Sequence, residues 1–259
     1  MVRKCIEQDR KHIKEYLKQE VEYNTYILAD IDDFGFDSEF QTVYVDEEND
    51  SIKGVYLCFY QNLIMYSKDN DINTEFLREL FTEYTPDVVM GKLENVNLAT
   101  ELLPDYNIKA QRLYFLNDPA NLENDENDIE KAQPGEAGEI FDFIQTIPEI
   151  RNLYTSKQMI IDRLEKNAGI HYLIRRGGKI VSHANSAAGS EYTTMIGGVS
   201  TDAEFRGKKM ASRIVSRLCR DIMAEGKRPC LFAADREEHN FYTRIGFERA
   251  GQWGIMVRG

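Results

Sequence analysis

Residues 196–211 read Ile-Gly-Gly-Val-Ser-Thr-Asp-Ala-Glu-Phe-Arg-Gly-Lys-Lys-Met-Ala. An apolar strand that contains glycines runs into a short polar turn, and Arg206 and Gly207 then open a helix whose apolar residues recur at helical spacing. The start of a helix offers an anion unpaired backbone N–H groups and the positive end of the helix dipole. Cationic side chains of the Arg-Gly-Lys-Lys turn lie at the same place, so the sequence predicts a diphosphate-binding site here.

A second motif follows at residues 241–247, which read Phe-Tyr-Thr-Arg-Ile-Gly-Phe and place Tyr242 on a helix that ends at a glycine before a strand. Between the two motifs the pattern predicts a helix over about 210–225, a turn at 225–229 and a buried strand over 230–234. The order strand, turn, helix, turn, strand, helix, strand resembles the GNAT superfamily of acyl-CoA-dependent N-acyltransferases.

The phosphate loop of that family reads Arg/Gln-x-x-Gly-x-Gly/Ala, and here its positions are filled by Arg206, Lys209 and Ala211. The middle glycine is therefore a lysine. Glycine at such a position allows unusual dihedral angles and a close approach of the backbone to a phosphate. A lysine fits only if its φ is negative, but it adds a charge suited to a phosphate.

The resemblance implies acetyl-CoA as cosubstrate, with no metal. It also implies that Tyr242 protonates the departing thiolate, and that a backbone N–H near Val199 binds the thioester oxygen. Asp235 stands where the family often has an asparagine in the turn after a strand. The residues expected to contact the cosubstrate are Val199, Ser200, Thr201, Arg206, Gly207, Lys208, Lys209, Met210, Ala211, Ser212 and Asp235.

The general base that N-acylation requires is left open by the sequence. Glu149 lies in a segment that often covers the acceptor pocket in the family, and Glu191 precedes the central strand. His183 lies in the middle of a strand and has the one unperturbed pKa near neutrality among the three. A water molecule is the fourth candidate.

The charge of the chain is divided unevenly between its halves. Residues 1–125 contain 12 Lys and Arg against 26 Asp and Glu, while the rest of the chain is near neutral, and the net charge is −12. An acidic chain of this kind is a poor nucleic-acid binder. It has no run of about 18 apolar residues and begins with charged residues, so we expect a cytoplasmic protein with no membrane partner. The four cysteines lack the spacing of a metal site or a disulfide framework.

The length of 259 residues suits two domains. We expect an α/β fold with a mixed sheet, divided into an N-terminal domain (1–117), an acidic linker (118–127) and a GNAT domain (128–259). In the N-terminal half the pattern predicts a helix over 6–21, a helix over 93–103 and a strand over 112–116, and it assigns no element to 23–31. The element order matches that of the C-terminal half, which favours a degenerate GNAT-like repeat; an unrelated α/β cap is the alternative.

The function that these residues and the resemblance favour is acetyl-CoA-dependent N-acetylation of a primary amine. A small molecule or a peptide is the expected acceptor, and a homodimer is left open. Two alternatives remain: a non-catalytic acyl-CoA-binding regulator, and an interaction module that has kept the fold without the cofactor.

Overall fold

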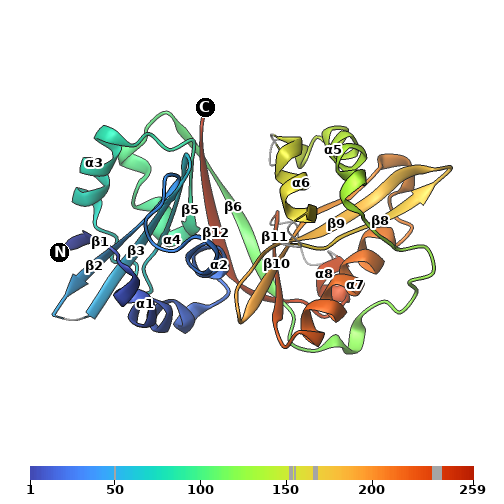
Figure 1. The fold of residues 1–259 in the computed structure, drawn as a ribbon, viewed down its shortest axis with the longest axis horizontal. Coiled ribbons are helices and arrows are strands. Elements are labelled where there is room, and N and C mark those ends of the chain that lie inside the picture. The colour runs from blue at the N-terminus through green and yellow to red at the C-terminus, as the bar shows by residue number, and fades with distance from the viewer. Residues whose placement is uncertain (50, 152–153, 155, 166–168, 235–240) are drawn as a thin grey trace. The chain divides into compact units, whose positions relative to one another are not determined.

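The structure is a computed structural model, and it describes residues 1–49, 51–151, 154, 156–165, 169–234 and 241–259 (Figure 1). The described residues divide into two compact units. The first unit contains residues 1–113, 232–234 and 249–259; the second contains residues 114–231, apart from the gaps just given, and 241–248. The domain limits expected at residues 117 and 127 stay a prediction, because compactness does not show that a segment folds by itself.

Helices and strands alternate along the first unit. They are β1 (Val2–Lys4), α1 (Arg10–Leu17), α2 (Thr25–Phe34), β2 (Gln41–Glu48), β3 (Ser51–Phe59), β4 (Asn62–Tyr66), α3 (Thr74–Glu83), β5 (Val88–Lys92), α4 (Leu93–Asn97), most of β6 (Tyr106–Phe115) and most of β12 (Glu248–Arg258).

The strands of the first unit form a mixed sheet. β1 pairs antiparallel with β2, β2 with β3, and β3 with β4. β4 and β5 run parallel, with Asn62 opposite Val88 and Met65 opposite Gly91. β12 then pairs antiparallel with β5, from Trp253 opposite Lys92 onward. The strand that ends the chain therefore belongs to the unit formed mostly by its first 113 residues.

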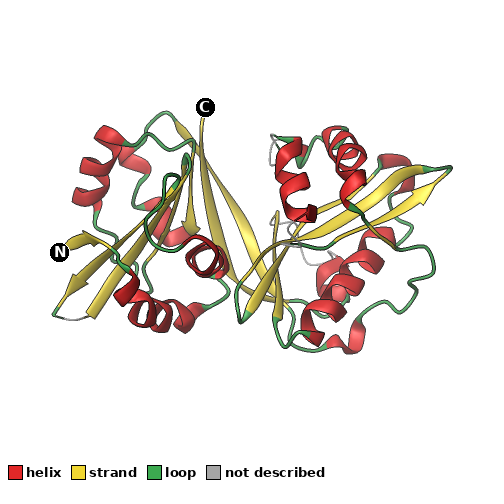
Figure 2. Ribbon diagram, viewed as in Figure 1, coloured by secondary structure: helices red, strands yellow, loops and turns green. Residues whose placement is uncertain are grey.

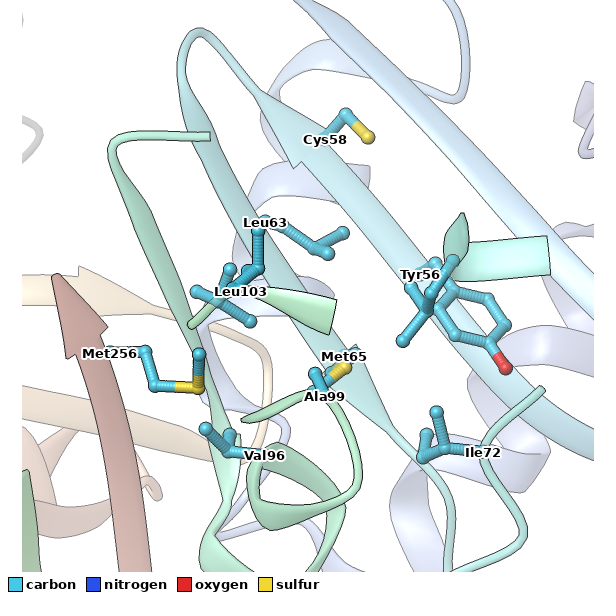
Figure 3. Close-up of a cluster of buried hydrophobic side chains, with 11 residues drawn as sticks. Tyr56, Cys58, Leu63, Met65, Ile72, Val96, Ala99, Leu103 and Met256 are labelled. Atoms are coloured by element: carbon cyan, nitrogen blue, oxygen red, sulfur yellow. The ribbon is translucent and has the colours of Figure 1, made fainter. Parts of the chain in front are cut away.

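A hydrophobic core of the first unit gathers side chains of β3, β4 and β5 with those of α3 and α4 (Figure 3). Tyr56, Met65 and Val96 are fully or almost fully buried in it. Gly91 allows the close approach of β5 to β4, because a Cβ atom there would lie 2.2 Å from the carbonyl oxygen of Met65. This packing holds the parallel pair in register.

The second unit repeats the alternation of helices and strands. Its elements are β7 (Glu130–Lys131), α5 (Ala137–Gln145), α6 (Lys157–Glu165), β8 (His171–Arg176), β9 (Lys179–Gly189), β10 (Thr193–Thr201), α7 (Met210–Ala224), the first part of β11 (Arg228–Ala234) and α8 (Phe241–Arg244).

The sheet of the second unit places β10 at the junction of its antiparallel and parallel parts. β7, β8, β9 and β10 pair antiparallel in that order. β10 and β11 run parallel, with Thr193 opposite Arg228 and Ile196 opposite Leu231. Helices α5 and α6 lie on one side of β8 and β9, and α7 and α8 lie on the other (Figure 2). The amphipathic pattern of α7 explains its place, since Ile214, Val215 and Leu218 are fully buried against the strands.

The predicted fold class, α/β with a mixed sheet, is confirmed, and most predicted elements lie within a few residues of the observed ones. Three expectations in the first unit are wrong. α2 occupies the segment left unassigned, because Ile27, Leu28 and Ile31 make it apolar without a clear stripe. The helix expected over 93–103 ends at Asn97, with a separate 3₁₀ turn after it. β6 starts at Tyr106 instead of residue 112; residues 107–110 are exposed and contain no apolar run that would predict a strand. None of the helices in the described ranges is long and apolar enough to cross a membrane.

Candidate active site

A cavity of about 830 Å³ lies in the second unit where β10 ends and α7 begins. Its walls also include α8 and the segment that follows α5. The predicted site residues that line it are Val199, Ser200, Thr201, Arg206, Gly207, Lys209, Met210, Ala211, Ser212 and Tyr242. The structure therefore brings the two sequence motifs together in one cavity.

The turn between β10 and α7 contains two residues in the left-handed region. The side chain of Asp202 accepts the N–H of Glu204 at 2.9 Å and starts a 3₁₀ turn over Ala203–Phe205. Gly207 follows with φ +77°, and Lys209 has φ +61° at the N-cap of α7. The condition of a negative φ at Lys209 is thus not met: the lysine adopts a conformation that favours glycine. A residue with a Cβ atom is strained there by roughly 1–2 kcal/mol.

The first turn of α7 carries no side-chain cap, since Lys209 makes no capping hydrogen bond. The first N–H groups of a helix have no partner within the helix. Met210, Ala211 and Ser212 of this turn line the cavity, so the positive end of the α7 dipole lies beside it. This arrangement is suited to a bound anion.

The two cations of the turn that line the cavity are each paired with an acid. Nη2 of Arg206 lies 3.2 Å from Glu149, and Nζ of Lys209 lies 3.0 Å from Glu123. Lys208 is directed elsewhere: its ammonium lies 4.8 Å from the ring centroid of Phe205, and it does not line the cavity. An anion entering the cavity therefore competes with Glu123 and Glu149 for Arg206 and Lys209.

Residues 123–128, which we call the acidic strap, are bound to α7. The N–H of Glu123 donates to Oγ of Ser216 at 3.0 Å. Ion pairs join Arg213 to Asp125 and Asp128, and Arg217 and Arg220 to Glu126. Arg213 and Arg220 also donate to the carbonyl oxygens of Asp125 and Glu123. The second half of the segment expected to be a linker is therefore attached to the helix whose first turn lines the cavity.

Strand β10 has a bulge beside the cavity. Gly197 lies opposite Asn185 and Ser200 opposite His183, so that Gly198 and Val199 together face a single residue of β9. The carbonyl oxygen of Gly198 accepts a hydrogen bond from Oγ of Ser200 at 3.0 Å. Pairing with β11 ends at Ile196, and Val199, Ser200 and Thr201, which follow on β10, line the cavity. An extended ligand can pair with such a strand backbone.

Tyr242 is half-buried on α8, with its ring among three other aromatic rings. The ring centroids of Phe241, Phe247 and Tyr114 lie 4.0, 6.0 and 6.1 Å from its own. Burial raises the pKa of the Tyr242 phenol, and the nearby Tyr114 raises it further. The phenol is therefore protonated at neutral pH and has a proton to donate.

Of the three candidate bases, Glu149 lines the cavity and the other two do not. His183 is completely buried, and burial lowers its pKa to about 4, so it is neutral and enclosed. Glu191 is exposed in the turn before β10. Asp235 lies outside the described residues. In the described part of the chain, no group of three or more His, Cys, Asp and Glu side chains could hold a metal ion.

Several cavity residues were not predicted from the sequence. Phe241, Arg244 and Ile245 are neighbours of Tyr242 in the second sequence motif. The lining residues that precede α5 in the sequence, and those that follow it, belong to no local motif. The unpredicted lining residues are Asn121, Glu123, Ile147, Ile150, Phe205, Phe241, Arg244 and Ile245.

Comparison with known proteins assigns the fold. The sequence model of the GNAT acetyltransferase family matches residues 161–256. A GCN5-related N-acetyltransferase-like protein from Streptococcus suis is 14% identical, with 98% of this chain and 99% of that chain covered and a TM-score of 0.62. A Drosophila protein is 10% identical, with 99% of this chain and 98% of that chain covered and a TM-score of 0.69. A tandem GNAT protein from the clavulanic acid biosynthesis pathway is 10% identical, with 100% and 98% covered and a TM-score of 0.58.

No curated protein matches the chain. At identities of 10–14% the solved structures show a common fold and nothing more. The C-terminal region of this chain is thus a member of the GNAT acetyltransferase family, and the whole chain has the fold of GNAT proteins, a tandem GNAT protein among them.

Proposed function

We propose that the chain is an acetyl-CoA-dependent N-acetyltransferase that acetylates a primary amine of a small molecule or a peptide. One observation carries the proposal. The basic turn before α7, the bulged end of β10 and the phenol of Tyr242 all line the same cavity. These are the parts that diphosphate binding, thioester binding and protonation of a leaving thiolate require.

The binding of acetyl-CoA uses the turn and the strand. The backbone N–H groups at the start of α7, with Arg206 and Lys209, hold the diphosphate. The backbone of Val199–Thr201 pairs with the extended pantetheine arm. The N–H of Val199 donates to the thioester oxygen and stabilises the negative charge that develops there.

Acetyl transfer then needs two proton movements. The lone pair of the neutral amine attacks the carbonyl carbon, and the C–S bond breaks as the amide forms. Tyr242 gives its proton to the departing thiolate sulfur. The proton of the acceptor nitrogen passes to water or to Glu149, the candidate base that lines the cavity.

The acceptor and the partners follow from charge. Glu123 and Glu149 line the cavity, and carboxylates attract a protonated amine before it loses its proton. With a net charge of −12, the chain is unsuited to nucleic acid and to anionic membranes, which fits a cytoplasmic enzyme. A homodimer remains an open proposal, which sedimentation of the purified chain tests.

A thiol-release assay with acetyl-CoA and a panel of amines tests the proposal, beside calorimetry with CoA. We expect CoA binding and amine-dependent release of thiol. Binding without release for any amine would support the non-catalytic regulator instead. Absence of binding would support the interaction module and contradict the proposed function.

A further inference from the structure

Two buried histidines form a chain of hydrogen bonds that ends at the bulge of β10. His171 of β8 and His183 of β9 are both completely buried. Nδ1 of His171 lies 2.9 Å from Nε2 of His183, and Nδ1 of His183 lies 3.1 Å from the carbonyl oxygen of Gly198. The chain is thus His171, His183 and then the peptide group between Gly198 and Val199.

The carbonyl oxygen of Gly198, the last group in this series of hydrogen bonds, determines which ring nitrogens carry hydrogens. A carbonyl oxygen only accepts, so Nδ1 of His183 carries the hydrogen. Burial lowers the pKa of His183 to about 4 and that of His171 to about 2, so both rings are neutral. Nε2 of His183 is then an acceptor, and Nδ1–H of His171 donates to it. Nε2 of His171 keeps a lone pair and has no partner within the described structure.

The bond to Gly198 sets the direction of a second group. The carbonyl of Gly198 and the N–H of Val199 belong to one planar trans peptide, in which they point in opposite directions. His183 holds the carbonyl on its own side, so the N–H of Val199 points away from His183. Val199 itself lines the cavity.

Close packing fixes the same peptide from a second side. Gly198 has φ +61°, and a Cβ atom on it would lie 2.4 Å from Oδ1 of Asn185 and 2.6 Å from Oη of Tyr154. These two side chains are themselves joined, since Tyr154 donates to Asn185 at 2.9 Å. The glycine is therefore clamped, and a turn of its peptide would break the bond to His183.

We propose that His183, itself oriented by His171, is a positioning residue that aims the N–H of Val199 at the thioester oxygen. This inference rests on the proposed function, because it concerns the same thioester. His183 does not touch the reacting atoms and does not exchange protons with them. Its role is to keep one backbone donor in place before the ligand arrives, which avoids a reorganisation cost during the reaction.

The test is isotope-edited infrared spectroscopy of acetyl-CoA labelled with ¹³C at its carbonyl and bound to the full chain. A hydrogen bond to the carbonyl lowers its stretching frequency relative to free acetyl-CoA, and we expect that shift in the wild type. His183→Leu should lose it, and His171→Leu should weaken it. His183→Asn keeps a donor near the position of Nδ1 and should retain most of it. Ile180→Ala, which removes buried packing from the same strand, should retain it fully.

Calorimetry supplies the second readout. The ratio of acetyl-CoA affinity to CoA affinity should fall about fivefold in His183→Leu, as expected for one lost hydrogen bond, and should stay unchanged in Ile180→Ala. An unshifted carbonyl in the wild type overturns the inference even if the variants fail to fold, as does a shift that survives in a folded His183→Leu. If neither ligand binds the wild type, the proposed function itself fails.

Discussion

In the second unit, Nζ of Lys209 lies 3.0 Å from a carboxylate oxygen of Glu123, beside the first turn of α7. Glu123 belongs to the acidic strap and lines the cavity together with Lys209. A diphosphate bound at this turn would compete with Glu123 for the same ammonium group. The strap therefore lowers the positive charge that the basic turn offers to CoA.

Replacing Glu123 with glutamine should raise the affinity for CoA, by up to about fivefold, because exposed ion pairs are worth at most about 1 kcal/mol. Calorimetry at low and at physiological salt measures the gain, which should shrink as salt rises. Glu225→Gln makes the same charge change at the C-terminal end of α7 and should leave the affinity unchanged. Equal gains in both variants would show that only net charge matters.

Replacing Arg206 with glutamate should weaken CoA binding about tenfold to a hundredfold, since a charge-assisted contact is lost and Glu149 gains a like-charged neighbour. Lys208→Glu is the matched control. It makes the same charge change two residues away, but Lys208 does not line the cavity, and its ammonium lies over the ring of Phe205. Calorimetry that finds the same loss in both would argue against a specific role for Arg206.

The two motifs could be predicted because each is a continuous stretch of sequence beside a recognisable helix start or helix end. The turn at Arg206–Lys209 precedes a helix with a clear apolar stripe, and Tyr242 precedes a glycine that ends its helix. The left-handed φ of Lys209 could not be read in this way. Only the geometry of the turn shows that Lys209 adopts a backbone conformation that favours glycine.

The histidine pair was beyond prediction because it depends on a shift of register. A regular hairpin turning at Gly177 and Gly178 would place His171 opposite Ala184, with His171 and His183 on opposite faces. An irregularity between Ile174 and Arg175 moves the pairing by one residue, so that His171 lies opposite Asn185 and on the same face as His183. Sequence patterns do not report such a shift.

The contacts of the acidic strap were not predicted for a related reason. Its composition is that of a linker, and its partners lie on α7, between 85 and 94 residues further along the chain. Arg213, Arg217 and Arg220 recur at helical spacing and face the strap. Composition alone cannot show that pairing.

Replacing Tyr242 with phenylalanine should lower amine-dependent thiol release about tenfold to a hundredfold while changing acetyl-CoA affinity less than about twofold. The hydroxyl matters only when negative charge develops on sulfur. Tyr114→Phe removes a hydroxyl from the neighbouring buried ring and should have little effect on release. Steady-state rates measure the effect on thiol release, and calorimetry measures the effect on acetyl-CoA affinity. An unchanged rate in Tyr242→Phe would leave the residue with packing as its role.

Replacing Lys209 with glycine should make the chain more stable than replacing it with alanine, by about 1 kcal/mol. Both changes remove the ammonium and its pair with Glu123, but only glycine adopts φ +61° without strain. Urea unfolding without ligand measures the difference between the two variants. Alanine as stable as glycine would show that the turn relaxes to a negative φ.

The full chain should bind one CoA, because the first unit has no equivalent of the basic turn. The start of α3 is capped by its own Asn73, whose side chain accepts the N–H of Phe76 at 2.9 Å. Beyond the parallel pair of β4 and β5, the buried amide of Asn95 accepts the N–H of Ser67 at 2.7 Å and donates to its carbonyl at 3.1 Å. The backbone groups that an extended ligand would use there are already satisfied.

Charge also disfavours CoA binding to the first unit, since residues 1–125 carry an excess of acids that repels a polyanion. Calorimetric titration of the full chain should therefore give a stoichiometry of one, and Arg206→Glu should weaken the whole signal. Asn95→Ala, which leaves Ser67 without its partner, should lower stability without adding a second site. A stoichiometry of two, or half of the binding heat persisting at wild-type affinity in Arg206→Glu, would mean that the first unit binds CoA as well.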